Sequence, residues 1–294
     1  MDYKIFFDKI NLPKEGRDLF WKINERLCDP AFKTRIYEGF EKFKLGNESF
    51  ERFLMSFSSE QNILPEQMHL YLTILYAENA KNKMEALGIL DEHFFGCFHG
   101  VGTNCEKTLK KTGVVGLEMF ELPWFRYSIN AELFLLGRLE FQLARSEYDV
   151  DFDDYKVKKG DTVLFVHIPG SAPLTEEACM DSYLRAIDFF GTYYGMKNLP
   201  CFCYTWILQP WIADVVSSSS NIIKFKNSFR LLETVQSIPH TFRFIFDDQY
   251  DNIDDYPTDK PLRKAAVERR KNNEFIGYGV GVRLINKETF KSYI

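Results

Sequence analysis

The sequence lacks the features that mark secreted, membrane-spanning and nucleic-acid-binding proteins. Its amino terminus has no basic stretch followed by an apolar one, and no segment reaches the roughly 18 uninterrupted apolar residues that a membrane-spanning helix needs. The formal net charge is -5, so the chain has no overall positive field that would attract nucleic acid or an anionic membrane. We therefore expect a cytoplasmic protein whose partner is a small molecule.

Patterns of metal binding and disulfide bonding are also missing. The six cysteines show no CxxC spacing, and most lie in apolar surroundings, where a thiol behaves as a small hydrophobic group. His93 and His99 lie near Cys97 and Cys105, but these spacings match no zinc-finger pattern. The aspartates within residues 247–255 lack the order of an EF-hand loop, which favours a solvated acidic loop. We predict reduced thiols and no bound metal.

The sequence does contain enough apolar material for two domains. It has 294 residues, of which 45% are hydrophobic, and this length suits two ordinary domains with a core each. From the start to about residue 90, apolar residues recur at helical spacing, and turn-forming pairs such as Asp29-Pro30 separate the periodic stretches. A further helix is predicted at residues 104–111. These patterns predict an all-helical domain over residues 1–115.

Beyond residue 116 the apolar pattern changes to the alternation typical of β-strands. Residues 138–145 alternate between apolar and polar side chains, and residues 163–168 are apolar on both faces, as in a central strand. Residues 178–194 return to helical spacing, with Thr175 as the N-cap. Further predicted elements are strands at residues 201–208, 228–232, 242–246 and 275–284, a short helix at 210–216 and a basic helix at 262–271. The predicted class is α+β, with the helical domain followed by a mixed sheet flanked by helices over residues 116–294.

The residues around the predicted central strand resemble a known superfamily. The run Val-His-Ile-Pro at residues 166–169, the loop after it and the helix at residues 176–194 are similar to the strand, pyrophosphate loop and helix of the Gcn5-related N-acyltransferase (GNAT) superfamily. Residues 136–141, 204–210 and 220–229 are similar to a bacterial group that joins a helical amino-terminal N-acyltransferase domain to a GNAT-like carboxy-terminal domain. The resemblance covers nearly the whole chain.

The resemblance implies how such a protein would work. In the superfamily two neighbouring strands of a mixed sheet splay apart, and the pantetheine arm of an acyl-coenzyme A (acyl-CoA) lies between them. Here these strands would be residues 163–168 and 201–208, and N–H groups at the start of the next helix would bind the pyrophosphate. The implied function is transfer of an acyl group from acyl-CoA to an amine. The residues implied to bind the cofactor are Ile168, Gly170, Ser171, Ala172, Leu174 and Thr175.

The predicted pyrophosphate loop departs from the pattern of the superfamily. The usual loop carries a basic or glutamine residue and two small residues, whereas residues 170–175 hold one glycine, no basic residue and Pro173, which has no N–H group. Glu176 and Glu177 follow in the first helical turn, where they satisfy the helix dipole and repel a pyrophosphate. The alternative function is therefore a catalytically silent GNAT-like protein that binds or senses a small molecule.

Two residues are candidates for the base that takes a proton from the amine. His167 ends the predicted central strand on the same face as Val163 and Phe165, and from there its side chain can reach a cleft. The alternative is a buried histidine bonded to a backbone group. Glu140 lies on the polar face of its strand and can act as the base if burial raises its pKa. The alternative for Glu140 is a solvated carboxylate paired with an arginine.

Three further residues are candidates for the remaining roles. Tyr204 and Trp206 share a face of the predicted strand at residues 201–208. Tyr204 is therefore a candidate to protonate the leaving thiolate, and Trp206 to shape the acyl pocket, with core packing of both rings as the alternative. The amide of Asn221 is a candidate to orient the substrate, with an Asx-turn or a helix cap as the alternative.

Overall fold

The described part of the chain consists of two compact units. The computed structural model describes all residues except 154, 171, 247–249 and 289–294. The units comprise Met1–Leu135 and Leu136–Ile294. No helix among the described residues is long and apolar enough to cross a bilayer.

The division between the units lies after the boundary that we place at residues 115 and 116 from the sequence. The intervening segment bonds to the helices before it. The Leu117 N–H donates to the Glu66 carbonyl over 3.0 Å, and Asn79 Nδ2 donates to the Ile129 carbonyl over 2.9 Å. These long-range bonds attach the segment to the helical unit, and sequence periodicity does not reveal them.

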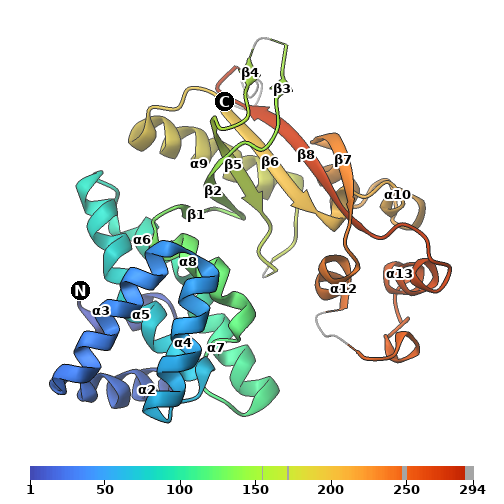
Figure 1. Cartoon of the computed structure of the whole chain (residues 1–294). Coiled ribbons are helices and arrows are strands. Elements are labelled where there is room, and N and C mark those ends of the chain that lie inside the picture. The colour runs from blue at the N-terminus through green and yellow to red at the C-terminus, as the bar shows by residue number, and fades with distance from the viewer. Residues whose placement is uncertain (154, 171, 247–249, 289–294) are drawn as a thin grey trace. The chain divides into compact units, whose positions relative to one another are not determined.

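The first unit is helical as far as Ile129, as the apolar spacing predicts, and its residues 133–135 are extended (Figure 1). Its α-helices are α1 (Tyr3–Lys9), α2 (Lys14–Asn24), α3 (Pro30–Leu45), α4 (Asn47–Gln61), α5 (Pro65–Ala86), α6 (Asp91–Cys97), α7 (His99–Thr112) and α8 (Leu122–Ile129), with 3₁₀ turns at Glu25–Cys28 and Met119–Glu121. The side chains of Asp2 and Asp29 accept backbone N–H bonds at the starts of α1 and α3, and Pro65 opens α5. Local capping signals therefore set several of the helix starts.

Aromatic rings fill the core of the first unit. Helix α5 buries every side chain over residues 68–74, so it is surrounded by other helices on all sides. The rings of Phe20 and Phe32 lie with centroids 5.3 and 6.3 Å from that of Tyr71 in α5. The abundant phenylalanines of this unit therefore serve packing.

The described residues form a mixed six-stranded sheet with the order β1-β2-β5-β6-β8-β7, in which every strand except β1 lies wholly in the second unit. Its strands are β1 (Leu133–Leu136), β2 (Leu139–Arg145), β5 (Thr162–His167), β6 (Leu199–Thr205), β7 (Arg230–Gln236) and β8 (Gly277–Ile285), and β3 (Val150–Asp151) and β4 (Lys156–Val157) form a separate hairpin. β5 and β6 run parallel, whereas β2 with β5, β6 with β8 and β7 with β8 are antiparallel. The predicted α+β class with a mixed sheet is confirmed.

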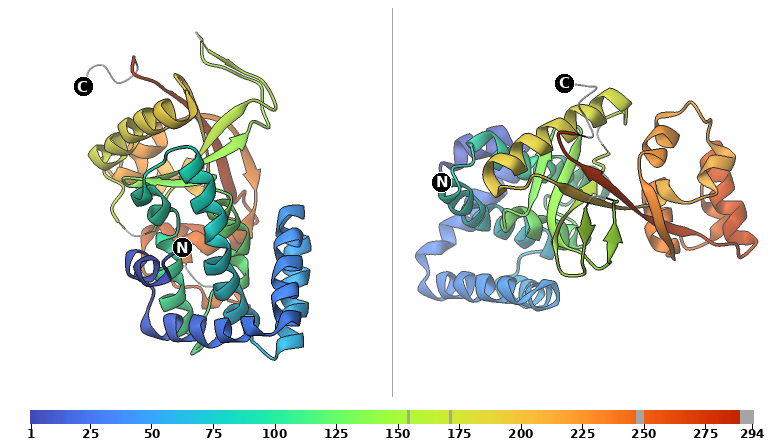
Figure 2. Two further views of the ribbon diagram at one scale, coloured as in Figure 1. Left: turned by 90° about the vertical axis from the view of Figure 1, so that its left-hand side faces the viewer. Right: turned by 90° about the horizontal axis from the view of Figure 1, so that it is seen from above.

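Each face of the sheet has its own cover. Helix α9 (Glu176–Tyr194) lies on one face, where the ring centroid of Tyr183 is 6.3 Å from that of Phe141 (Figures 1 and 2). The β3–β4 hairpin covers part of the other face, where Val150 and Val157 pack in one apolar cluster with strand residues. Alternate residues of each strand therefore belong to the helix side or to the hairpin side.

Small helices beyond the sheet build a second core. They are α10 (Ile212–Val215), α11 (Asn221–Asn227), α12 (Ile238–Phe246) and α13 (Pro261–Lys271). The strand that we predict at residues 242–246 is wrong, because these residues belong to α12. Phe242, Ile245 and Phe246 are buried at helical spacing, and an apolar run this short fits a strand and a helix equally well.

Glycines of β8 determine how β6 ends. β6 stops at Thr205 and continues as the 3₁₀ turn Trp206–Leu208, so the strand predicted over residues 201–208 is too long. A Cβ atom on Gly279 would lie 2.7 Å from Leu208 Cβ, and one on Gly281 would lie 2.6 Å from Leu208 Cδ1. The bare backbone of β8 thus lets the turn pack directly on the strand, where a larger residue would push it away.

Candidate active site

Strands β5 and β6 pair only over a short central segment. The register partners are Leu164 with Cys201 and Phe165 with Phe202. The pairing ends there although both strands continue, since β5 stays paired with β2 to its last residue and β6 stays paired with β8 as far as Thr205. The arrows of β5 and β6 point apart at these ends in Figure 1.

We call residue 166 of β5 and residues 203–205 of β6 the unpaired strand ends, because they lie beyond the last register pair of the two strands. Continuing the register of the paired segment would bring His167 opposite Tyr204, so these two side chains lie on the same face and on either side of the parting. The two strands have no register partners beyond Phe165 and Phe202, so the β5–β6 ladder does not continue along their facing edges. Such edges can bond an extended ligand that carries amides, in the manner of an added strand.

The two candidate bases, Glu140 and His167, are direct cross-strand neighbours. Glu140 is the register partner of His167, and its side chain is only 4% exposed, so it is not a solvated carboxylate. His167 Nε2 lies 2.8 Å from Gln142 Oε1. Because an amide oxygen only accepts, Nε2 carries the hydrogen, and Nδ1 has the lone pair. Burial lowers the pKa of His167 to about 4, so the ring is neutral near pH 7.

The hydroxyl of Tyr204 is buried and, among the described residues, has no hydrogen-bond partner. Its ring packs 4.9 Å from the ring of Phe165 and 6.2 Å from that of Tyr278. Burial raises the pKa of Tyr204, and the charges of Glu147 and Glu233 raise it further. The hydroxyl therefore stays protonated and is available as a donor on the β6 side of the parting.

The two candidate substrate-binding residues lie away from this arrangement. Trp206 is not on β6 with Tyr204 but in the 3₁₀ turn, where it packs against the core that contains Trp211. Asn221 is the exposed first residue of α11, and the cap of that helix is Ser220, whose Oγ accepts from the Ile223 N–H. The shared strand face that we predict for Tyr204 and Trp206 is therefore wrong, because the strand ends between them.

Some of the backbone N–H groups at the start of α9 that could bind an anion are already bonded to protein side chains. Ser171 lies outside the described residues. Thr175 caps α9, and its Oγ1 accepts from the Ala178 N–H over 3.2 Å. A bond from its own backbone N–H and one from Thr175 lower the pKa of Glu177, whose carboxylate is thus held at the helix start. Lys224 Nζ lies 3.3 Å from Glu176 Oε2 and offsets part of this negative charge.

A basic residue that the sequence pattern does not reveal lies against this loop. The guanidinium of Arg138, from the turn between β1 and β2, donates to the carbonyls of Ala172 over 2.7 Å and Pro173 over 3.1 Å. The Arg138 N–H also bonds Ser182 Oγ of α9 over 2.7 Å. Arg138 Nη1 is buried without a partner among the described residues. Because Arg138 lies more than thirty residues before the loop, only the folded sheet brings the two together.

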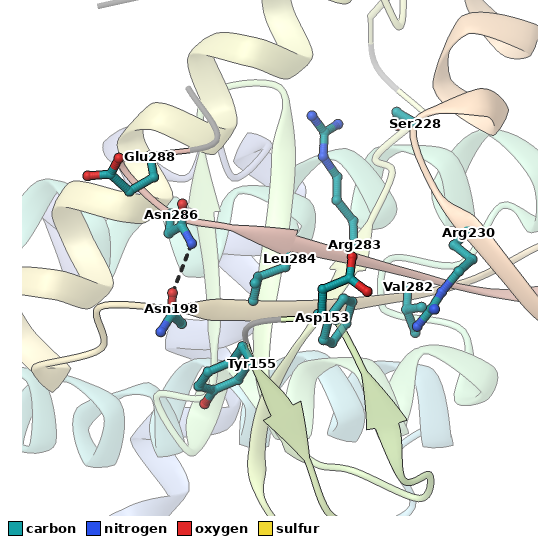
Figure 3. Close-up of a pocket in the computed structure, with 11 residues that line it drawn as sticks. Asp153, Tyr155, Asn198, Ser228, Arg230, Val282, Arg283, Leu284, Asn286 and Glu288 are labelled. Atoms are coloured by element: carbon teal, nitrogen blue, oxygen red, sulfur yellow. Dashed lines mark hydrogen bonds between the residues drawn. The ribbon is translucent and has the colours of Figure 1, made fainter. Parts of the chain in front are cut away.

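A separate cavity of about 630 Å³ lies farther along β8 (Figure 3). It is lined by Phe152, Asp153, Tyr155, Asn198, Ser228, Arg230, Val282, Arg283, Leu284, Asn286 and Glu288. Asn286 Nδ2 donates to Asn198 Oδ1 over 2.9 Å at one end, as the dashed line in Figure 3 shows. The cavity flanks β8 residues 282–284, whereas the unpaired end of β6 pairs with β8 residues 279–281. It is therefore distinct from the parting of β5 and β6.

No metal centre emerges from the described residues. They contain no group of three or more His, Cys, Asp and Glu side chains placed to hold an ion. The aspartates at positions 247 and 248, which belong to the acidic segment considered above, lie outside the described residues.

Comparisons with known proteins agree with this geometry. The model of the family described as the GNAT-like C-terminal domain matches residues 133–283. Among solved structures, an acyltransferase variant in complex with octanoyl-CoA and an acyltransferase in complex with decanoyl-CoA and teicoplanin each superpose with a TM-score of 0.72 at 18% identity, covering 96% of this chain and 87% of theirs. No curated protein matches the chain. Since the family model spans more than half of the sequence, the chain belongs to the family of the GNAT-like C-terminal domain.

Proposed function

We propose that the protein is an acyltransferase that moves an acyl group from acyl-CoA to an amine. The observation that carries the proposal is the end of β5–β6 pairing after Phe165 and Phe202, with His167 and the unpartnered Tyr204 hydroxyl on either side. The solved neighbours in complex with octanoyl-CoA and decanoyl-CoA support the class of donor.

The structure suits the pantetheine arm of the cofactor better than its pyrophosphate. The unpaired strand ends suit the pantetheine arm, because its amides can bond the free edge groups of both strands. The start of α9 suits the pyrophosphate less well, since Thr175 and Glu177 occupy amides there. Arg138 and Lys224 are cations from sequence-distant segments that contact the loop and the start of α9, respectively. We expect acyl-CoA to be held mainly through its pantetheine arm and acyl chain.

The residues beside the strand ends have the properties that acyl transfer requires. Acyl-CoA supplies a thioester, which an amine attacks to form an amide and release a thiol. Nδ1 of His167 can accept the proton that the attacking nitrogen loses, since this nitrogen becomes strongly acidic once it is bonded to the acyl carbon. Glu140 stabilises the imidazolium that results, as the register partner of His167. Tyr204 can give its proton to the departing sulfur.

The neighbours also suggest a size for the acceptor. Two of them are in complex with teicoplanin or 10C-teicoplanin, so an amine on a molecule larger than a free amino acid is a reasonable acceptor for this chain. A bulky acceptor is compatible with the unpaired strand ends, because only its amine has to reach His167.

Isothermal titration of the full chain with CoA, octanoyl-CoA and decanoyl-CoA tests donor binding, and thiol release in the presence of an amine panel tests transfer. We expect saturable binding, stronger for the acyl forms, and thiol release that depends on the amine. Absence of binding by all three compounds would contradict the proposal.

A second candidate function is supported by the occupied α9 amides and the two glutamates at the helix start. In this alternative the unpaired strand ends bind a small molecule without catalysis. Tight binding of acyl-CoA with no amine-dependent thiol release, in a preparation that is correctly folded, would favour this function over acyl transfer.

A further inference from the structure

We infer that the sheet face next to the unpaired strand ends carries a recognition site for an ammonium group, formed by the rings of Phe165, Tyr204 and Tyr278 and the carboxylates of Glu147 and Glu233. This inference deepens the proposed function, because it assigns the acceptor as a cationic amine that the protein binds before transfer. We call these five residues the ammonium site.

The rings of the site form a continuous row. Phe165 of β5 packs 4.9 Å from Tyr204 of β6, and Tyr204 lies 6.2 Å from Tyr278 of β8, centroid to centroid. All three side chains are only half-buried, so part of each ring remains accessible. The π-face of an aromatic ring attracts a cation within about 6 Å of its centroid, and several rings together make a stronger site.

Carboxylates border this row. Glu233 of β7 accepts a short hydrogen bond from the Tyr148 hydroxyl, which fixes its position, and Glu147 precedes that tyrosine. The Tyr148 ring packs 6.2 Å from that of Phe202, which lies two residues before Tyr204 on the same face of β6. Both carboxylates are exposed, and both contribute to the raised pKa of Tyr204. At neutral pH these two carboxylates are negative, whereas the neighbouring phenols are neutral. Such negative charges favour an ammonium ligand over a neutral one.

Two buried polar atoms at the row lack partners among the described residues. One is the Tyr204 hydroxyl and the other is His240 Nδ1, whose ring packs 4.8 Å from Tyr278. Burial lowers the pKa of His240, so its ring is neutral at pH 7 and an unprotonated ring nitrogen can accept an N–H bond. Unpartnered polar atoms in native structures commonly mark a bound ligand or water. An ammonium group offers the donors that both atoms can accept.

The position of the site relates it to the proposed base. Phe165 lies two residues before His167 on the same face of β5, which corresponds to a spacing of about 7 Å along the strand. An amine held over the Phe165 ring therefore lies on the same sheet face as His167 and beside the parting of the strands. Loss of one proton to solvent converts this bound ammonium into the neutral amine that attacks.

Binding of benzylammonium, whose ammonium group carries N–H donors, and of its neutral isostere ethylbenzene to the full chain tests the inference without any acyl-CoA, with NMR titration as the readout. We expect the cation to bind at least tenfold more tightly than the isostere. The double substitution Glu147→Gln with Glu233→Gln should weaken cation binding about tenfold and leave the isostere unaffected. Asp188→Asn, on an exposed position of α9 across the sheet, is the control and should change neither affinity.

The outcomes separate this inference from the proposed function. Equal affinity for both probes, or cation binding that survives the double substitution, would overturn the inference even if acyl-CoA binds and reacts. Selective cation binding by a chain that does not bind acyl-CoA would uphold the ammonium site and overturn the acyltransferase proposal. If the double variant is less stable, Tyr278→Ala provides a second test, with the same expected loss of cation affinity.

Discussion

A histidine of the helical unit and one of the sheet unit share a lowered pKa but have different hydrogen-bond partners. His69 in α5 is fully buried, its Nδ1 lies 3.3 Å from the Leu117 carbonyl, and a further backbone bond to Glu118 holds it. His167 has the same lowered pKa of about 4, but its bond goes to the side chain of Gln142 beside the unpaired strand ends. A shared pKa shift therefore reports burial in both cases, and only the neighbouring groups distinguish a structural histidine from a candidate base.

The largest expected effect is a change of His167→Ala, which should lower acyl-transfer turnover by roughly 10³-fold while the affinity for acyl-CoA changes little. The matched change His69→Ala should leave turnover per folded molecule unchanged and lower the free energy of unfolding by about 2 kcal/mol, because it opens a cavity and leaves backbone groups unpaired. Steady-state kinetics with urea denaturation checks both. Equal effects of the two changes on turnover would remove the distinction between the histidines.

Two tyrosines with buried hydroxyl groups extend the comparison. Tyr76 in α5 donates to the Ile36 carbonyl over 2.9 Å, whereas the Tyr204 hydroxyl has no partner among the described residues. Tyr76→Phe should lower the free energy of unfolding by about 1 kcal/mol, and Tyr204→Phe should leave it unchanged or raise it slightly. Tyr204→Phe should lower turnover about 10²-fold. Full turnover in this variant would exclude the hydroxyl as the proton donor.

The buried histidines should also make stability depend on pH. The pKa values of His69 and His167 fall from 6.5 to about 4 on folding, so the unfolded chain takes up protons at a pH where the folded chain does not. The contribution of these two histidines to the free energy of unfolding should therefore be fully present above pH 6.5 and should decrease as the pH falls toward 4. Urea midpoints at pH 7, 5.5 and 4.5 measure how steeply stability decreases with falling pH, and this decrease should be smaller in His69→Ala. An unchanged slope would mean that His69 does not contribute.

The smallest expected effect concerns the helix start. Glu177→Gln removes a carboxylate that lies where a pyrophosphate would bind, so the affinity for CoA should rise on the order of threefold. Glu268→Gln on α13 is the control and should have no effect on titrations with CoA. A weaker affinity in Glu177→Gln would show that the carboxylate has a favourable role in the site.

The sequence predicts the helical unit and the central strands well because their signals are local. Helical spacing, the caps at Asp29 and Pro65 and the alternation in β2 all act within a few residues. The end of β6 and the helix α12 were missed for the opposite reason. Contact of Leu208 with the glycines of β8 ends the strand, and burial in a second core decides that Phe242 is helical.

In the candidate site, too, some features follow from local sequence signals and others depend on long-range packing. The positions of His167 and Tyr204 on their strands follow from alternation, whereas the face that they share depends on the register of β5 and β6. The pairing of Glu140 with His167 needs the register of two strands, and Arg138, Glu233 and His240 reach their places only through packing over long sequence distances. Such contacts leave no periodic signal in the sequence.

The alternate glycines of β8 have a wider implication. A strand with hydrogen atoms in place of side chains at positions 277, 279 and 281 gives up packing stability, and it gains space for a neighbouring chain segment. The course of a strand can thus be determined by the side chains that its neighbour lacks. Distant relatives that keep this glycine spacing in their final strand, even where every reactive residue differs, would be expected to keep the same departure of β6 from the sheet.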